Sequence, residues 1–231
     1  MSIGENVRHV RAAIEQAAGG RSVCLVAATK MNDAAAVREA VAAGVDACGE
    51  NRVQELLEKD AQGAYDGVPK HFIGHLQRNK VRQVVGRVDL IQSVDSEELL
   101  ALIDRAAAKL GLVQDILIEV NVGGESQKSG VAPGDLPALL EKAAEYSGLR
   151  VRGLMCIPPV PVPGEENAGY FAQMYQLFID NREKKYDNVS MEILSMGMTD
   201  DYLPAIAAGA TMVRVGTGIF GPRSYGKAEA E

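Results

Sequence analysis

The sequence has few cysteines, no long apolar run and fewer basic than acidic residues. Its three cysteines, Cys24, Cys48 and Cys156, are widely separated, stand in or beside apolar runs and form no CxxC pair. This spacing predicts reduced core residues rather than disulfides or a zinc site. No stretch approaches the roughly 20 apolar residues that a membrane-spanning helix needs. The formal charge of -7 argues against a broad nucleic-acid footprint, while a local basic pocket is still compatible with it.

Several motifs of enzyme chemistry are also absent. The sequence contains no HxH or HExxH spacing for a metal and no GxSxG nucleophile elbow. No GxGxxG follows the first apolar run, where a dinucleotide-binding fold would have it. The N-terminal segment has the pattern of an amphipathic helix and lacks the apolar centre of a secretion signal. These absences disfavour metal catalysis and acyl transfer, and they make the cytoplasm the expected location.

What is present is an alternation of short apolar runs with longer segments of helical period. The runs predicted to be strands are residues 23–29, 47–49, 72–73, 90–93, 116–122, 151–157, 191–194 and 212–215. Between them, alanines and leucines recur at threes and fours, which predicts helices over 33–43, 97–110, 136–146 and 167–184. This alternation is typical of parallel strands joined by helical crossovers.

Glycine and proline mark the boundaries of these elements. Gly148 and Gly209 fall where helices should end. The proline-rich piece over 157–167 breaks both periods and is predicted to be one long strand-to-helix loop. No linker divides the chain, so residues 1–231 are expected to form one domain, with a short mobile tail from about residue 222.

Periodicity alone fits either a closed barrel or an open doubly wound sheet. The glycine pattern favours the barrel, because the small-residue segments follow the seventh and eighth runs, where barrels commonly bind phosphate. We therefore expect a single (β/α)8 TIM barrel with an extra N-terminal helix.

Lys30 follows the first apolar run, so it is expected at the carboxyl end of a strand, where barrel active sites are assembled. Partial enclosure disfavours the charged form of a lysine, and the neutral amine can attack an aldehyde. The alternative interpretation is a surface lysine that starts a loop.

Two segments near the C-terminus predict an anion site. Ser195, Met196 and Gly197 follow the seventh run, and Gly216 and Thr217 follow the eighth. Small residues there allow backbone N–H groups to approach an anion. A glycine-bearing turn is by itself more often only a turn, but two in successive barrel loops favour a phosphate ligand.

Further polar candidates stand at strand ends. Arg214, flanked by valines, either pairs with a helix carboxylate or faces the pocket, where it can only donate hydrogen bonds. Asn51, His75 and Ser129 are candidates for contacts with the ligand. His75 is either a general acid or base, or a rim histidine held by a structural hydrogen bond.

The segments that carry these candidates resemble a known family. Between about Asn6 and Arg223 the sequence contains, in order, VAATK, GENRVQE, HFIGHLQRNK, SVDS, EVNVGGESQKSG, GLMCIPP, LSMGMTDDY and VRVGTGIFG. In this order they resemble the pyridoxal phosphate homeostasis proteins. The resemblance implies a barrel like the N-terminal domain of alanine racemase that binds pyridoxal 5′-phosphate (PLP), the active form of vitamin B6.

The resemblance also implies roles for individual residues. Lys30 matches the lysine that forms the Schiff base with PLP, and Arg214 matches an arginine near the pyridine nitrogen. Residues 195–197 and 216–217 match the phosphate-binding segments, and Asn51 matches an asparagine close to the cofactor.

Whether bound PLP does chemistry here is a separate question. In alanine racemase a tyrosine of an added β-domain supplies the second acid or base, and here only residues 221–231 follow Phe220. An arginine at the pyridine nitrogen also weakens the cofactor as an electron sink. We therefore expect a cytoplasmic monomer that holds PLP for apo-enzymes, with no catalytic residue, metal, nucleic acid or membrane. A racemase-like PLP enzyme and a Schiff-base aldolase on a phosphosugar are the alternatives.

Overall fold

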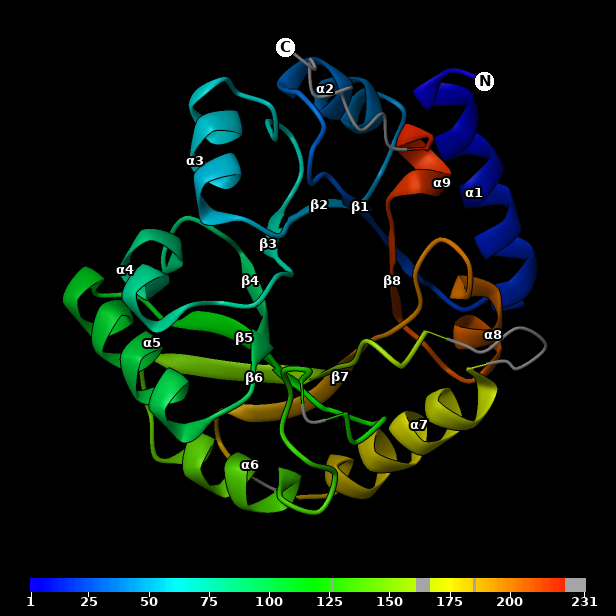
Figure 1. Cartoon of the computed structure of the whole chain (residues 1–231). Coiled ribbons are helices and arrows are strands. Elements are labelled where there is room, and N and C mark those ends of the chain that lie inside the picture. Colours follow the sequence, from blue (N-terminus) through cyan, green and yellow to red (C-terminus); the bar gives the residue numbers. More distant parts are fainter. Residues whose placement is uncertain (126, 161–166, 185, 223–231) are drawn as a thin grey trace, which may run out of the picture.

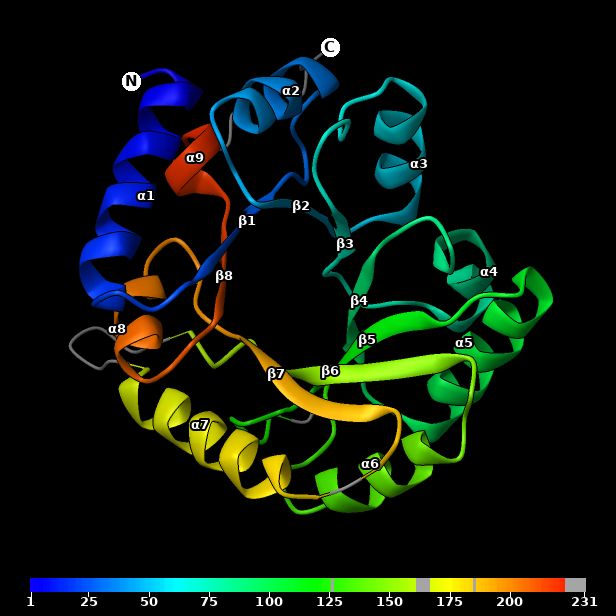
Figure 2. The same ribbon diagram turned by 180° about the vertical axis from the view of Figure 1, so that it is seen from behind.

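The computed structural model describes residues 1–125, 127–160, 167–184 and 186–222. Its strands are all parallel and close into a barrel in sequence order, as Figures 1 and 2 show from opposite sides. They are β1 (Cys24–Ala28), β2 (Ala47–Glu50), β3 (Lys70–Phe72), β4 (Leu90–Val94), β5 (Gln114–Glu119), β6 (Leu149–Met155), β7 (Val189–Ser195) and β8 (Met212–Val215). The ring closes where Cys24 of β1 stands opposite Met212 of β8.

Helices surround the barrel (Figure 1). They are α1 (Ile3–Ala18), α2 (Ala34–Ala42), α3 (Val53–Ala61), the 3-10 helix η1 (Arg78–Lys80), α4 (Val81–Val84), α5 (Glu97–Leu110), α6 (Leu136–Ala144), α7 (Ala168–Arg182), α8 (Tyr202–Ala207) and α9 (Thr217–Phe220). The predicted (β/α)8 TIM barrel with an extra N-terminal helix is confirmed. The predicted C-terminal tail from residue 223 onward, and residues 161–166 of the predicted proline-rich loop, lie outside the described residues.

The extra helix α1 begins at a capping box. Ser2 Oγ accepts a hydrogen bond from the Glu5 N–H at 3.2 Å, and the Ser2 N–H donates to the Glu5 carboxylate at 2.7 Å. Its apolar face packs beside α8 and α9 (Figures 1 and 2). Asn6 Nδ2 donates to the Ile219 carbonyl at 2.8 Å. This contact ties α1 to the helix that follows β8.

Of the two glycines predicted to end helices, one does so. Gly209 follows the last residue of α8 and its cap with a φ of 110°, a conformation that suits glycine. The prediction for Gly148 was wrong, because α6 ends at Ala144. Close packing accounts for Gly148 instead, since a Cβ there would lie 2.9 Å from the backbone oxygen of Asp104.

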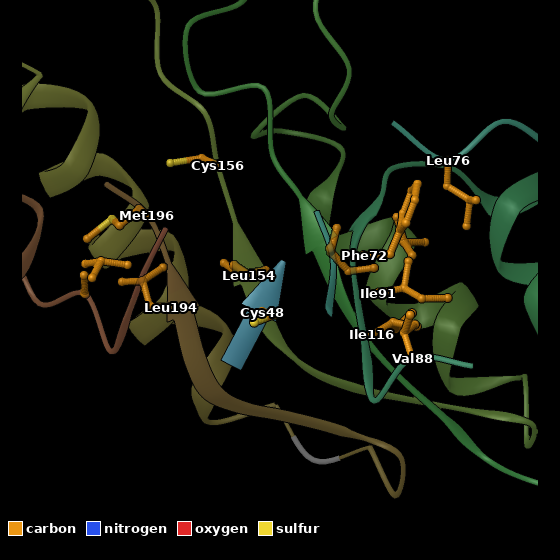
Figure 3. Packing of buried hydrophobic residues seen from close by; sticks show 14 of the residues in the cluster. Cys48, Phe72, Leu76, Val88, Ile91, Ile116, Leu154, Cys156, Leu194 and Met196 are labelled. Carbon is orange, nitrogen blue, oxygen red and sulfur yellow. The ribbon is translucent and has the colours of Figure 1, made fainter. Parts of the chain in front are cut away.

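Two apolar clusters hold the barrel together. The larger lies between strands and helices, and Figure 3 shows part of it, with Phe72, Ile91 and Ile116 of successive strands gathered at one side. The buried residues of the smaller cluster all come from strands, so they fill the barrel interior. They are Val26, Ala47, Leu90, Leu117, Met155 and Met212.

All three cysteines are free thiols, as predicted. Cys48 and Cys156 are buried and Cys24 is half-buried. Burial raises the pKa of each thiol to about 12. Among the described residues, no group of three or more His, Cys, Asp or Glu could hold a metal ion. No helix within the described ranges has the length and apolar character needed to cross a membrane.

A polar layer lies on the apolar interior, toward the carboxyl ends of the strands. Gln92, Glu119 and Arg214 each stand two positions after a residue of the smaller cluster. Because strand side chains alternate between faces, these three point into the barrel as well. All three are buried. The functional end of the barrel therefore has a polar floor.

Candidate functional site

Lys30 lies just beyond β1, at the carboxyl-terminal face of the barrel, and is half-buried. It lines a pocket together with residues of the segment that follows β8. The lining consists of Ala28, Lys30, Met31, Asn32, Gly216, Thr217, Phe220, Gly221 and Pro222. Three residues predicted for the site, Lys30, Gly216 and Thr217, therefore meet in one pocket.

The loops that follow β7 and β8 are joined by Thr199. Its Oγ1 accepts hydrogen bonds from the backbone N–H groups of Gly216 and Gly218, both at 3.2 Å. A Cβ at Gly218 would lie 2.9 Å from the Val215 side chain, so only glycine fits this position without a shift. The two predicted anion-binding loops are therefore neighbours, joined by backbone N–H groups at the start of α9 that donate to Thr199.

The contacts of residues 195–197 are mostly with the rest of the barrel. Ser195 is buried, and the Met196 side chain belongs to the larger apolar cluster (Figure 3). The Met196 N–H donates to the Met212 carbonyl at 3.1 Å. Gly197 has a φ of 92°. None of the three lines the Lys30 pocket as described, and their contact with a phosphate stays a prediction.

Arg214 stands at one end of a buried chain of hydrogen bonds. Its Nη1 donates to Ser195 Oγ at 2.6 Å and its Nη2 to the Cys156 carbonyl at 2.8 Å. Ser195 Oγ donates to Gln92 Oε1 at 2.7 Å, and Gln92 Nε2 lies 3.0 Å from His71 Nδ1. Within the described residues, no carboxylate forms an ion pair with Arg214. Pairing with a helix carboxylate was therefore the wrong alternative.

Burial shifts the pKa of two groups here, Glu119 of the polar layer and His71, whose ring contacts Gln92. It lowers the pKa of His71 to about 4, so the imidazole is neutral near pH 7. Burial and the neighbouring Asp95 carboxylate raise the pKa of Glu119 to about 7, against the opposing influence of Arg214. The layer under the pocket thus holds one fixed positive charge and one carboxyl group that is partly protonated near neutral pH.

Asn51, His75 and Ser129 form a second group at the same face of the barrel. Asn51 and His75 line a separate pocket, which they share with Phe72 of β3 and which has no lining residue in common with the Lys30 pocket. His75 Nδ1 lies 3.0 Å from Ser129 Oγ. Asn51 Oδ1 is buried without a hydrogen-bond partner among the described residues. A buried acceptor of this kind fits a ligand that can donate.

The sequence reasoning missed several residues that build this site. Thr199, Gln92 and Glu119 were not singled out. For Gln92 and Glu119 the signal is a polar residue two positions after an inward apolar one in a strand. Glu55 and Lys59, whose contacts reach the turn around Lys30, were also missed, although they are an i, i+4 pair on α3.

The site combines a half-buried primary amine, backbone N–H donors in the same pocket and a fixed guanidinium in the layer below. An amine forms imines with carbonyl compounds, and N–H donors of this kind bind phosphate oxygens. The residues present therefore fit a phosphorylated aldehyde such as PLP.

The family model described as the N-terminal domain of alanine racemase matches residues 2–224, so the chain belongs to this class of barrel proteins. Alanine racemase of Clostridium difficile 630 has a TM-score of 0.68 at 15% identity, and the match covers 96% of this chain and 58% of the racemase chain. This likeness shows the shared fold alone.

Within that class the chain belongs to the pyridoxal phosphate homeostasis protein family. The homeostasis protein of Aquifex aeolicus (strain VF5) is 42% identical over 95% of this chain and 96% of the relative. PipY of Synechococcus elongatus PCC7942, solved with PLP bound, is 36% identical with a TM-score of 0.84, over 95% of this chain and 100% of PipY. The family predicted from the ordered motifs is confirmed.

Proposed function

We propose that this chain binds PLP as a Schiff base on Lys30 and holds it for the cell's vitamin B6 homeostasis, without transforming a substrate. The observation that carries the proposal is the shared pocket of Lys30, Gly216 and Thr217. An amine and backbone N–H groups in one pocket suit a single ligand that carries both an aldehyde and a phosphate. Support comes from PipY, a relative solved with PLP bound.

The covalent step needs only the Lys30 amine. Its nitrogen forms a C=N bond with the aldehyde carbon, and the aldehyde oxygen leaves as water. The phosphate is assigned to the loops of residues 195–197 and 216–217, with Thr199 between them. Arg214 is assigned to the side of the pyridine nitrogen, since a guanidinium can only donate.

The remaining predicted residues are assigned to the sides of the cofactor. Asn51 supplies the buried acceptor for a donor on the ligand. His75 and Ser129 are already joined by a short contact, and they form the wall opposite Lys30 in this proposal.

A carrier is favoured over an enzyme for an electronic reason. An arginine beside the pyridine nitrogen leaves it unprotonated, and a neutral ring stabilises a carbanion less well than a protonated one. The curated relatives of matching length are named homeostasis proteins. We further propose that residues 1–231 act as one PLP-binding domain, as a monomer in the cytoplasm, with apo PLP enzymes as recipients.

Absorbance, reduction and mass spectrometry test the covalent link. PLP should turn the purified protein yellow, and borohydride should then fix the label on Lys30. Lys30→Ala should abolish both, and Lys30→Arg, which keeps the positive charge, should also stay colourless. A colourless wild-type protein, or a label only on another lysine, would refute the assignment.

Turnover assays separate the carrier from the enzymes. Prolonged incubation with racemisable amino acids should give no Lys30-dependent turnover, and a phosphosugar should not be cleaved by the PLP-free protein. Transfer of PLP to an apo-enzyme should be faster from this protein than its spontaneous release. Lys30-dependent turnover in either assay would contradict the carrier.

A further inference from the structure

A buried ion network lies behind the turn that carries Lys30. It consists of Glu50 at the end of β2 and of Glu55 and Lys59 on α3. Lys59 Nζ lies 2.6 Å from Glu50 Oε2 and 3.0 Å from Glu55 Oε2. The side chains of Lys59 and Glu50 are only 7% and 1% exposed. Charged side chains are rarely buried to this degree unless they are paired.

The network holds the peptide group before Lys30. Lys59 Nζ donates its third hydrogen bond to the Thr29 carbonyl at 2.8 Å, which uses all three ammonium hydrogens. Thr29 Oγ1 also donates to Glu50 Oε2 at 3.0 Å. Both the backbone and the side chain of Thr29 are therefore fixed by buried charges.

The network also holds the peptide group after Lys30. The Met31 N–H donates to Glu55 Oε2 at 2.8 Å. The two peptide groups on either side of a residue define its φ and ψ, and hence the direction of its side chain. The contacts at Thr29 and Met31 thus set the direction in which Lys30 leaves the backbone.

Met31 needs such a contact. Its φ of 63° makes it the only non-glycine residue in the described part of the chain with a positive φ. This conformation is disfavoured for a residue with a side chain. Met31 is 50% exposed, so packing does little to enforce this backbone conformation. The hydrogen bond to Glu55 is the observed compensation.

We propose that Glu50, Glu55 and Lys59 are positioning residues for Lys30, which hold the turn from Thr29 to Met31 so that the amine points into the pocket of Gly216. The inference rests on the proposed function, because it assumes that Lys30 captures PLP. None of the three residues lines that pocket in the described structure, so they act through the backbone of the turn.

Glu55 is the residue to change, because its side chain is 20% exposed and its loss leaves the Lys59 contact with Glu50 in place. Glu55→Ala should slow capture of PLP by about tenfold. It should slow capture of pyridoxal, which lacks the phosphate, by a similar factor. Glu58→Ala is the matched control, an exposed glutamate of the same helix whose side chain accepts from Gln54.

A second substitution separates positioning from simple stability. Met31→Gly removes the penalty for a positive φ, so it should restore part of the capture rate in the Glu55→Ala background. Each rate is compared with the thermal midpoint of the same variant. A glycine that restores capture without restoring the midpoint supports positioning.

Failure of the positioning inference can be told apart from failure of the proposed function. Capture by Glu55→Ala at the wild-type rate would overturn the inference, and so would a slow rate that Met31→Gly leaves unchanged. Failure of the wild-type protein to capture PLP would instead overturn the proposed function.

Discussion

Arg214 Nη1 donates a hydrogen bond of 2.6 Å to Ser195 Oγ inside the barrel, where both residues are buried. The single hydroxyl hydrogen of Ser195 goes on to Gln92 Oε1 at 2.7 Å. The hydroxyl therefore links a permanent charge to a neutral amide. The orientation of the guanidinium under the pocket depends on this link.

Ser195→Ala should destabilise the protein by about 1–3 kcal/mol, because it leaves a buried donor and a buried acceptor without partners. Urea unfolding measures this loss. Ser190→Ala is the control on the same strand, since Ser190 is only half-buried and its Oγ donates a longer hydrogen bond, of 3.4 Å, to the Val151 carbonyl. Equal losses in the two variants would contradict the role of the Ser195 link.

Thr199→Val should weaken binding of PLP by about tenfold, since the variant keeps the shape of the side chain but loses the hydroxyl that joins the two phosphate loops. Binding of pyridoxal, which has no phosphate, should change little. Thr199→Ser keeps the hydroxyl and should bind PLP nearly as the wild type does. Equal weakening of both ligands would place Thr199 outside the phosphate site.

His71 should make the protein sensitive to acid. Burial lowers its pKa from 6.5 to about 4, so the unfolded chain takes up a proton in this range while the folded protein does not. The contribution of His71 to the free energy of unfolding is present above pH 6.5. As the pH falls toward 4 this contribution is lost, by up to roughly 3 kcal/mol. His71→Gln should flatten this part of the stability curve. An unchanged slope in the variant would be evidence against a buried neutral imidazole.

Glu119 should change the pH dependence of stability in the direction opposite to that of His71. Burial raises its pKa from 4.5 to about 7, so the folded protein keeps a proton that the unfolded chain loses. Stability should therefore fall as the pH rises from 4.5 to about 7. Over this pH range the free energy of unfolding of Glu119→Gln should rise relative to that of the wild type by up to roughly 3 kcal/mol, measured by chemical unfolding. A gain that does not depend on pH would show that Glu119 titrates normally.

Much of the fold followed from local patterns. The helix predicted over 97–110 has those bounds in the structure, and all the predicted strands overlap observed ones. The error at Gly148 arose because the glycine serves packing against Asp104, a contact between residues far apart in sequence. Periodicity describes single elements and carries no information on such contacts.

The residues of the candidate site were likewise only partly predictable from local patterns. Lys30 after the first strand and Gly216 and Thr217 after the last were predicted from local spacing, and they line one pocket. Thr199 and Glu55 could not be found in this way. Thr199 matters because β7 and β8 are neighbours in the ring, and Glu55 because α3 packs beside the end of β1.

By itself, the sequence determined the alternation of strands and helices, the family, and the lysine at the end of the first strand. These are properties of local spacing and of ordered motifs. Only the tertiary structure decided that Arg214 reaches Ser195 rather than a helix carboxylate, and that Lys59 and Glu55 hold the turn around Lys30. The physical reason is that buried polar groups need partners, and closure of the barrel selects which distant residues supply them.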